Sequence, residues 1–240
     1  MAAIQSLTAT MLTQWQRHAL LSNNLANVAT PAYKRDDLAL TPSSPAATAV
    51  AANGRTVPAD TQAMFAFTDF SAGPIHQTGR GLDVALDGRG FFAVQTPNGV
   101  RYTRAGNFSV SADGYLMTAN GQQVLGDAGP IIVGNARATV TPDGVVRDGD
   151  RVLGTLRVND FDDLTRLVKD GGNVYRADAE QTPTAAKGCR TVGGALESAN
   201  VNPVETMVGM IDLLRTYEAA QRAIQAVDET NRQANDLGRI

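Results

Sequence analysis

The glycines of this 240-residue chain divide it into three parts. Residues 1–53 contain no glycine, residues 71–154 contain 15 of the 23, and only Gly209 and Gly238 follow residue 194. Glycine is unfavourable inside helices and favoured in tight turns. The distribution therefore predicts a helix, then a turn-rich β region, then a second helix.

The first helical pattern covers about residues 3–28. Large apolar residues recur there at spacings of three and four, which places them on one face of a helix. They are Ile4, Leu7, Met11, Leu21, Leu25 and Val28, with Gln14 and His18 as interruptions. A residue that precedes proline avoids the helical region, so the helix is expected to end by Thr30-Pro31.

The second helical pattern begins at Asn202-Pro203. Asn202 is a good N-cap, Pro203 suits the first helical position, and Glu205 occupies the place of a capping-box carboxylate. The apolar positions are Met210, Leu213, Tyr217, Ala220, Ile224, Val227 and Ala234, with Asn231 as a polar insertion. This a/d pattern, sustained over about three and a half heptads, predicts a long helix that ends near Leu237-Gly238.

Between residues 64 and 190 the pattern is that of short β-strands. Phe91–Thr96, then Pro97-Asn98-Gly99, then Val100–Arg104 predict a hairpin. Further short runs are Phe108–Val110, Tyr115–Thr118, Gln123–Leu125, Thr139–Thr141, Val145–Arg147 and Val152–Val158. Six Asx-Gly pairs, at Asp87, Asn98, Asp113, Asn120, Asp143 and Asp148, punctuate the region as turns. No helical pattern interrupts the strands, which disfavours a parallel sheet.

The expected fold class is therefore mainly β with α. A central antiparallel β domain, an irregular barrel or sandwich, is flanked by N- and C-terminal amphipathic helices that pair as a coiled-coil-like core. We expect residues 1–38 and 195–240 to form a terminal helical assembly domain, residues 39–67 an extended low-complexity connector, and residues 68–194 the central β domain. The helical stripes are too narrow to be wrapped by the β domain, so they must meet each other or copies in neighbouring molecules. The helix pair is expected to be marginal in a monomer and fully ordered in an assembly.

Composition excludes several classes of protein. A net charge of −3 argues against a nucleic-acid binder, and no apolar run reaches the length of a membrane-spanning helix. A single cysteine, Cys189, cannot form an internal disulfide, and with His18 and His76 it leaves little material for a zinc site. Residues 1–16 carry no charged side chain, unlike the basic start of a signal peptide. Any export is expected to proceed without a conventional cleaved signal.

Patterns typical of catalysis or ligand binding are incomplete. Asp83 and Asp87 resemble paired carboxylates, but Asp87-Gly88 is better explained as a turn. Asp148-Gly149-Asp150 resembles part of a calcium loop without its downstream Glu, and Gly88-Arg89-Gly90 lacks the helix of a phosphate loop. Cys189 has only Arg190 nearby to activate it, and the two histidines are read as a surface or interface residue and a loop residue. No catalytic, cofactor-binding or metal site is predicted, and the chain is expected not to be an enzyme.

Three stretches resemble the flagellar rod and hook protein family. The N-terminal one is Ser22–Lys34, with an Asn-Asn-Leu-Ala-Asn block followed by Thr30, Tyr33 and Lys34. The central one comprises Leu82–Leu86, Gly90–Gln95 and Tyr102–Phe108, and the C-terminal one comprises Leu196–Glu205, Tyr217-Glu218 and Val227–Glu229. One departure is Ala32, where the family usually carries glycine; a left-handed turn there would be slightly strained.

This resemblance implies a structural subunit that assembles helically through its terminal helices to transmit torque. The short chain fits a rod subunit, and Leu125–Ile131 and Val227–Asn235 look most like proximal-rod members; a distal-rod or hook subunit is the alternative. The resemblance further implies export, unfolded, through the flagellar type III apparatus into a periplasmic rod. The implied partners are copies of the chain, other rod subunits and the export apparatus, and no cofactor is implied.

The predicted assembly residues lie in the two terminal patterns. They are Ile4, Leu7, Met11, Leu21, Asn23, Asn24, Leu25, Asn27, Asn202, Met210, Leu213, Tyr217, Ile224, Val227 and Asn231. The asparagines have two interpretations: helix-terminal capping, or amide hydrogen bonds between subunits. Two other classes of function stay open from the residues alone, a secreted carbohydrate-acting enzyme on a β scaffold and a monomeric binding module such as an adhesin.

Overall fold

The computed structural model describes residues 2–40, 64–134, 137–178, 180–186 and 188–237. The chain divides into two units. The helical unit comprises Met1–Ala26, Asp36–Phe67 and Asn202–Ile240, and the β unit comprises Asn27–Arg35 and Thr68–Val201. The low-complexity part of the expected connector, residues 41–60, lies outside the described residues.

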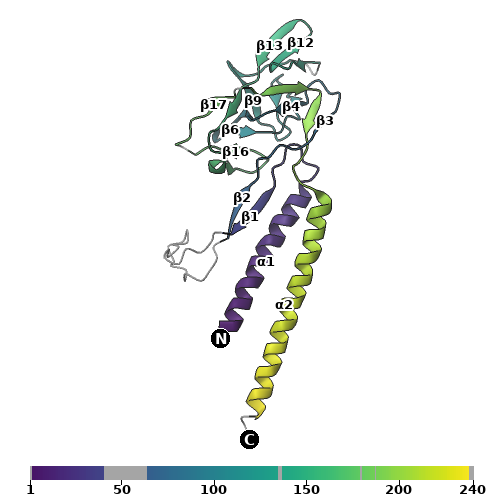
Figure 1. Ribbon diagram of the computed structural model, residues 1–240. Coiled ribbons are helices and arrows are strands. Elements are labelled where there is room, and N and C mark those ends of the chain that lie inside the picture. Colours follow the sequence, from purple (N-terminus) through teal and green to yellow (C-terminus); the bar gives the residue numbers. More distant parts are fainter. Residues whose placement is uncertain (1, 41–63, 135–136, 179, 187, 238–240) are drawn as a thin grey trace. The chain divides into compact units, whose positions relative to one another are not determined.

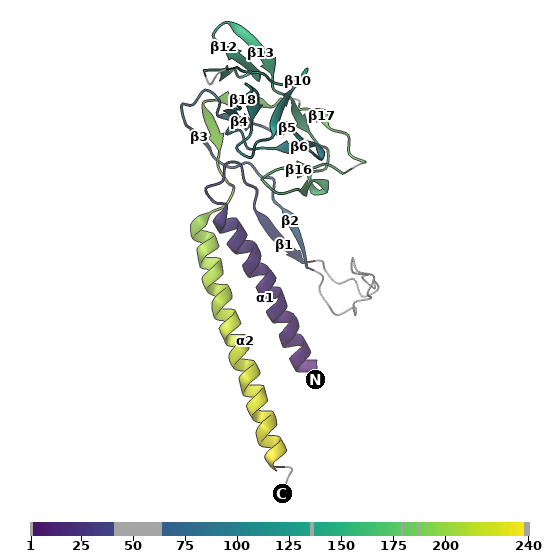
Figure 2. The same cartoon turned by 180° about the vertical axis from the view of Figure 1, so that it is seen from behind.

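The helical unit contains two long helices, α1 (Ala2–Ala26) and α2 (Pro203–Leu237). They lie side by side and antiparallel, as Figures 1 and 2 show. The side-chain oxygen of Asn202 accepts hydrogen bonds from the amides of Val204 (3.1 Å) and Glu205 (3.4 Å), which confirms it as the N-cap of α2. The unit also contains a two-stranded sheet of β1 (Asp36–Leu40) and β2 (Met64–Thr68).

The apolar stripe predicted for α2 is its covered face. Met210, Tyr217, Ala220 and Ile224 are half-buried, and Leu213 is 6% exposed. Leu21 of α1 lies against this face, since a Cβ placed on Gly209 would be 3.7 Å from its Cδ1. The side chains of Ile4, Leu7, Val227, Asn231 and Ala234, which belong to the predicted stripes, lie outside the described residues.

Short antiparallel strands build the β unit. They are β3 (Ile75–Gln77), β4 (Val84–Asp87), β5 (Phe91–Thr96), β6 (Gly99–Thr103), β7 (Ser109–Val110), β8 (Leu116–Met117), β9 (Gln123–Gly126), β10 (Gly129–Pro130), β11 (Thr139–Val140), β12 (Val145–Asp148), β13 (Arg151–Thr155), β14 (Val158–Asp160), β15 (Val168–Lys169), β16 (Tyr175–Arg176), β17 (Thr184–Ala185), β18 (Arg190–Gly193) and β19 (Ala195–Glu197). A single 3₁₀ turn, η1 (Leu164–Arg166), is the helical element of the described part of this unit.

The strands form one large sheet and several small ones rather than a barrel. The path of the large sheet is β15-β16-β6-β5-β9-β8-β7, with β10 on β9, β14 on β5 and β17 on β14. Smaller sheets pair β11-β12-β13, β18-β4 and β19-β3. Among the described residues the sheet has open ends, so the barrel alternative of the expected fold is wrong. Strands of two to six residues are too short and too scattered to close one continuous sheet.

The predicted turns and hairpin are confirmed. β5 pairs with β6 from Phe92↔Thr103 to Thr96↔Gly99. The glycine of every predicted Asx-Gly pair has a positive φ, between 59° and 114°.

Two local predictions are wrong. The run Val152–Val158 is split, because the amide of Leu156 bonds to Gly144 and that of Arg157 to Leu125, which moves the chain from one sheet to the next. His76 lies in β3, opposite Leu196, and not in a loop.

Two large apolar clusters and a small one around Tyr33 lie in the described part of the β unit. The larger one includes Phe92, which meets Phe108 edge-on with ring centroids 5.1 Å apart. The second is aromatic and is centred on Phe91, Phe161 and Tyr175. Because β5 sends Phe91 to one cluster and Phe92 to the other, it is the shared wall of the two cores.

Candidate functional site

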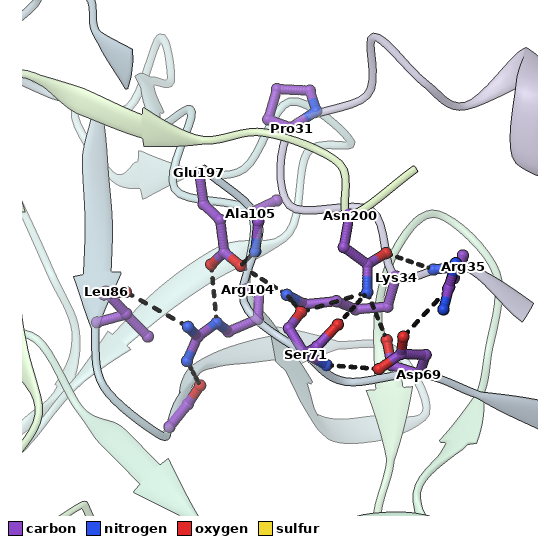
Figure 3. Close-up of polar contacts among 12 residues, drawn as sticks. Pro31, Lys34, Arg35, Asp69, Ser71, Leu86, Arg104, Ala105, Glu197 and Asn200 are labelled. Carbon is purple, nitrogen blue, oxygen red and sulfur yellow. Dashed lines mark hydrogen bonds and ion pairs between the residues drawn. The ribbon is translucent and has the colours of Figure 1, made fainter. Parts of the chain in front are cut away.

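A buried ion cluster joins three distant segments of the β unit (Figure 3). Glu197 of β19 receives Lys34 Nζ on Oε1 at 2.5 Å and Arg104 Nε on Oε2 at 2.9 Å. The side chains of Lys34, Arg104 and Glu197 are 1%, 6% and 1% exposed. We call these three residues the ion cluster. It brings together the N-terminal, central and C-terminal stretches that carry the family resemblance.

Backbone groups complete the hydrogen bonding of the ion cluster. Arg104 donates to the carbonyls of Leu86, Gly88 and Gly90 at 2.8–3.3 Å. Lys34 Nζ also donates to the Ser71 carbonyl at 2.7 Å. The Gly73 amide donates to Glu197 Oε1 at 2.9 Å.

These bonds allow the ion cluster to hold its three segments of the chain together. A buried charge is tolerated only when it is paired and hydrogen-bonded, so the loss of one member leaves the others buried without a complete set of partners.

Burial shapes the titration of Lys34. Removal of its ammonium from water lowers the pKa of Lys34 below the usual lysine value, and the Glu197 carboxylate opposes this effect without cancelling it. Glu197 is therefore the group that most strongly favours a charged Lys34 inside the fold, and Asp69 adds a smaller effect in the same direction.

A second group of polar contacts flanks the ion cluster. Asn200 Oδ1 accepts from the Arg35 amide at 2.8 Å, and its Nδ2 donates to the Asp69 carbonyl at 2.8 Å. Asp69 accepts from Arg35 Nε at 3.1 Å and from the Ser71 amide at 2.9 Å. These bonds join Asn200 to Arg35, which follows Lys34 in the chain, and to the segment that contains Asp69.

The lowered pKa of Asp69 predicts that the β unit loses stability in acid. Burial alone would raise the pKa of Asp69, but hydrogen bonds from Ser71 and Arg35 outweigh it and hold the pKa below the usual value. A lowered pKa contributes stability above the unfolded pKa of about 3.9, and this contribution is lost as the pH falls through the folded value.

We expect Asp69→Asn to cost up to about 1 kcal/mol at neutral pH, because the pair is partly exposed, and less at about pH 2, because the carboxylate is progressively protonated in acid. Urea unfolding of both chains at the two pH values measures this difference. An equal difference in the free energy of unfolding at both pH values would contradict a lowered pKa of Asp69.

The turn before Lys34 is left-handed. Ala32 has φ 53°, and its amide donates to the Glu197 carbonyl at 2.7 Å. The departure from glycine therefore leaves the turn in place, with an alanine in a conformation that costs about 1–2 kcal/mol for an L-residue. Next to it, Tyr33 packs against Ala199 and Val201.

This turn gives a matched pair of variants. Ala32→Val places a β-branched residue at positive φ in a position only 1% exposed, and we expect it to lower the free energy of unfolding by about 2 kcal/mol. Ala32→Gly relieves the strain but loses a buried methyl and adds backbone freedom, so we expect a change within about 1 kcal/mol. Thermal unfolding of the two variants checks this order, and equal losses would contradict a left-handed Ala32.

The predicted asparagines have different surroundings. Asn24 is 5% exposed, and its amide donates to the Asp36 carbonyl at 2.8 Å and accepts from the Asp36 amide at 3.0 Å. Asn27 accepts from the Thr30 hydroxyl at 3.1 Å, and Asn23 is exposed. The amide of Asn24 is thus used within its own chain, where it holds β1.

Over the first three turns of α2, the opposite side is apolar and is left exposed by the residues that the structure describes. Its five residues are Val204, Met207, Val208, Ile211 and Leu214, with exposed fractions from 48% to 69%. We call this set the outer face of α2. Ile211 and the buried Leu213 are about 160° apart around the helix, so α2 has two separate apolar faces. On α1, Leu12 and Trp15 are 60% and 66% exposed.

The ion cluster was not among the predicted site residues, although all its members lie in stretches singled out for their resemblance. The signal is weak: Glu197 lies among small or apolar residues, as Ala195-Leu196-Glu197 shows, but Lys34 opens the charged run Lys34–Asp37. Such a residue is either at the surface or paired in the core. The sequence alone does not say which, because the partners are far apart along the chain.

The other candidates for chemistry have structural roles. Asp83 accepts from Thr78 and Arg80, both at 2.7 Å, while Asp87 is exposed, so the two carboxylates do not form a pair. Burial raises the pKa of the Cys189 thiol, which disfavours its reactive thiolate.

Among the described residues, no three His, Cys, Asp or Glu side chains gather as a metal site would require. Neither described helix has the length and hydropathy needed to cross a lipid bilayer.

Comparison with known proteins identifies the class. The family model described as the flagellar hook protein FlgE/F/G D1 domain matches residues 85–148, and the one described as the flagellar basal body rod FlgEFG protein C-terminal matches residues 192–237. The chain belongs to the family of flagellar basal-body rod and hook proteins. The two matches contain Arg104 and Glu197 respectively.

Within this family the chain is FlgF-like. It is 34% identical to the flagellar basal-body rod protein FlgF of Caulobacter vibrioides, over 92% of this chain and 91% of the relative. It is also 34% identical to FlgF of Escherichia coli K12, over 92% of each chain. The flagellar basal-body rod protein FlgG of Bacillus subtilis is 28% identical over 92% of each chain.

Proposed function

We propose that this protein is a structural subunit of the flagellar basal-body rod that assembles helically through its terminal helices. Its membership in the family and its similarity to relatives named as rod proteins support this role. The higher identity to FlgF than to FlgG favours the proximal rod, with the distal rod as the alternative.

The outer face of α2 is the observation that carries the proposal. A helix at a protein surface ordinarily has one apolar stripe, which faces its own core. Here that stripe faces α1, and five further large apolar side chains remain in water over three turns. Contiguous apolar surfaces of this kind are rare on monomers and typical of interaction sites. The outer face is therefore suited to burial against another subunit.

The two faces have different roles in this proposal. The inner stripe, with Met210, Leu213, Tyr217 and Ile224, pairs α2 with α1 of the same chain in a coiled-coil-like core. The outer face packs on neighbouring subunits. Contacts between unlike surfaces propagate into a helical filament rather than closing as a dimer, and close-packed seams resist the shear that torque imposes.

The remaining features of the proposal are those that the resemblance to the family implies. The rod subunit is exported unfolded through the flagellar type III apparatus without a cleaved signal and assembles in the periplasm. Its partners are copies of itself and other rod subunits. It acts as a structural element and not as an enzyme.

A charge on the outer face tests the proposal. We expect Ile211→Glu to reduce incorporation into the rod more than tenfold, because a carboxylate buried in an apolar interface without a partner costs several kcal/mol. The measurement is complementation of a strain that lacks the gene, read as motility and as electron micrographs of isolated basal bodies.

Ala223→Glu is the matched control. Ala223 is also exposed on α2, about 120° around the helix from Ile211, and its substitution adds the same charge away from the outer face. Complete rods with Ile211→Glu, or equal defects in the two variants, would contradict the proposal.

A further inference from the structure

The C-terminal strands of the β unit pair with its N-terminal strands. β18 pairs with β4 from Arg190↔Asp87 to Gly193↔Val84, and β19 pairs with β3 from Ala195↔Gln77 to Glu197↔Ile75. The segment 190–197 therefore supplies the neighbours of two strands that precede it by about a hundred residues. The first strands of the unit are unpaired on these edges until the last ones arrive.

Among the described residues, Glu197 also supplies the only carboxylate that forms an ion pair with the two buried cations of the ion cluster. Without it, Lys34 retains the Ser71 carbonyl and Arg104 retains three backbone carbonyls. Carbonyl dipoles solvate a cation but do not neutralise it. Two like charges would then share a site that is at least 94% shielded from water, which is strongly unfavourable.

Glu197 also forms hydrogen bonds with backbone amides of the N-terminal part of the β unit. The Ala32 amide donates to the Glu197 carbonyl, and the Gly73 amide donates to its side chain. A Cβ on Gly73 would lie 2.1 Å from the Ser198 carbonyl oxygen, so residues 197–198 pass directly against this glycine. Residues 32, 73 and 104 thus complete their native contacts only when residue 197 is in place.

We infer that Glu197 is the residue that completes folding of the β unit, and that the unit stays unfolded until the chain up to Glu197 is available. Glu197 acts through its ion pairs with Lys34 and Arg104. If the chain emerges from the export apparatus N-terminus first, this requirement would prevent folding before most of its length has emerged. This consequence for export rests on the proposed function, whereas the folding requirement does not.

The first test compares full-length variants. Glu197→Gln retains the shape but removes the charge, and we expect it to lower the folding equilibrium constant of the β unit at least about 100-fold. Glu180→Gln, at an exposed glutamate paired with Arg166, is the control and is expected to have almost no effect. Near-ultraviolet circular dichroism during urea unfolding reports the buried Tyr33, Tyr102 and Tyr175.

A compensated variant separates charge from general damage. Lys34→Met, Arg104→Met and Glu197→Met together remove all three charges with similar volumes, and we expect this chain to recover most of the stability lost in Glu197→Gln. If the triple variant is as unstable as Glu197→Gln, or if Glu197→Gln is as stable as the unaltered chain, the inference is overturned.

Refolding tests the order of events. Pulse-labelled hydrogen exchange of the unaltered chain is expected to show β5 and β6 gaining protection together with β19. In the triple variant, β5 and β6 are expected to gain it earlier, an effect that a merely structural role for Glu197 would not produce. Protection of β5 and β6 before β19 in the unaltered chain would overturn the inference. The proposed rod function would be unaffected by that result.

Discussion

Gly106→Ala is expected to lower the free energy of unfolding of the β unit by more than about 4 kcal/mol. A Cβ on Gly106 would lie 1.7 Å from the carbonyl oxygen of Val84, far inside any van der Waals contact. Val84 has no exposed surface, and its amide donates to the Gly106 carbonyl at 3.0 Å. The clash is therefore between two backbones that are bonded to each other, and neither can withdraw without breaking β4.

Gly154→Ala is the matched control for this prediction. Gly154 lies in β13, where the nearest atom to an added Cβ would be 3.5 Å away, an ordinary contact, and its φ is outside the left-handed region. Because alanine has less freedom in the unfolded chain, we expect a change within about 1 kcal/mol. Urea unfolding followed by near-ultraviolet circular dichroism measures both variants. Similar stabilities for the two would contradict the close approach at Gly106.

Leu213→Ala is expected to destabilise the helical unit by about 2–5 kcal/mol. Leu213 is 6% exposed at the centre of the inner stripe of α2, and truncation to alanine leaves a cavity against α1. Alanine favours helices at least as well as leucine does, so the loss comes from packing and not from propensity. Helix content at 222 nm during thermal unfolding measures it.

The neighbouring leucine distinguishes the two faces of α2. Leu214 is 48% exposed, and we expect Leu214→Ala to change the stability of the free chain by less than about 0.5 kcal/mol. If the outer face binds another subunit, the same substitution should weaken assembly. A Leu214→Ala chain that unfolds as readily as Leu213→Ala would show that the faces have been assigned wrongly.

Local patterns predicted the local structure of this chain well. The a/d spacing around Leu213 predicted which side of α2 is covered, because a helix repeats its face every three to four residues whatever lies beyond it. Asn202 and Pro203 predicted where α2 starts, since capping is a matter of adjacent atoms. The Asx-Gly pairs predicted turns for the same reason, as positive φ is a property of the residue.

Contacts between distant segments could not be predicted in this way. The ion cluster joins Lys34, Arg104 and Glu197, and nothing in the spacing of three charged residues states that they meet. The run Val152–Val158 is uniform in sequence, and only the distant amide partners at Gly144 and Leu125 divide it into β13 and β14. Such features arise from tertiary packing, which overrides local preference.

The outer face of α2 was visible in the sequence but was not read as a second stripe. Val204, Met207, Val208, Ile211 and Leu214 also recur at spacings of three and four. These five positions lie outside the long a/d stripe, and spacing alone does not show which of two stripes is covered. The exposed fractions separate them, because one stripe is covered by α1 and the other is not.

The most direct test of the account is amide hydrogen exchange along α2, compared between the free chain and the chain assembled in rods. We expect residues 204–214 to exchange at least about tenfold more slowly in the assembly, while β5 and β6 keep the protection that they have in the free chain. Unchanged exchange along residues 204–214 would mean that no subunit covers the outer face, and it would contradict assembly through this helix.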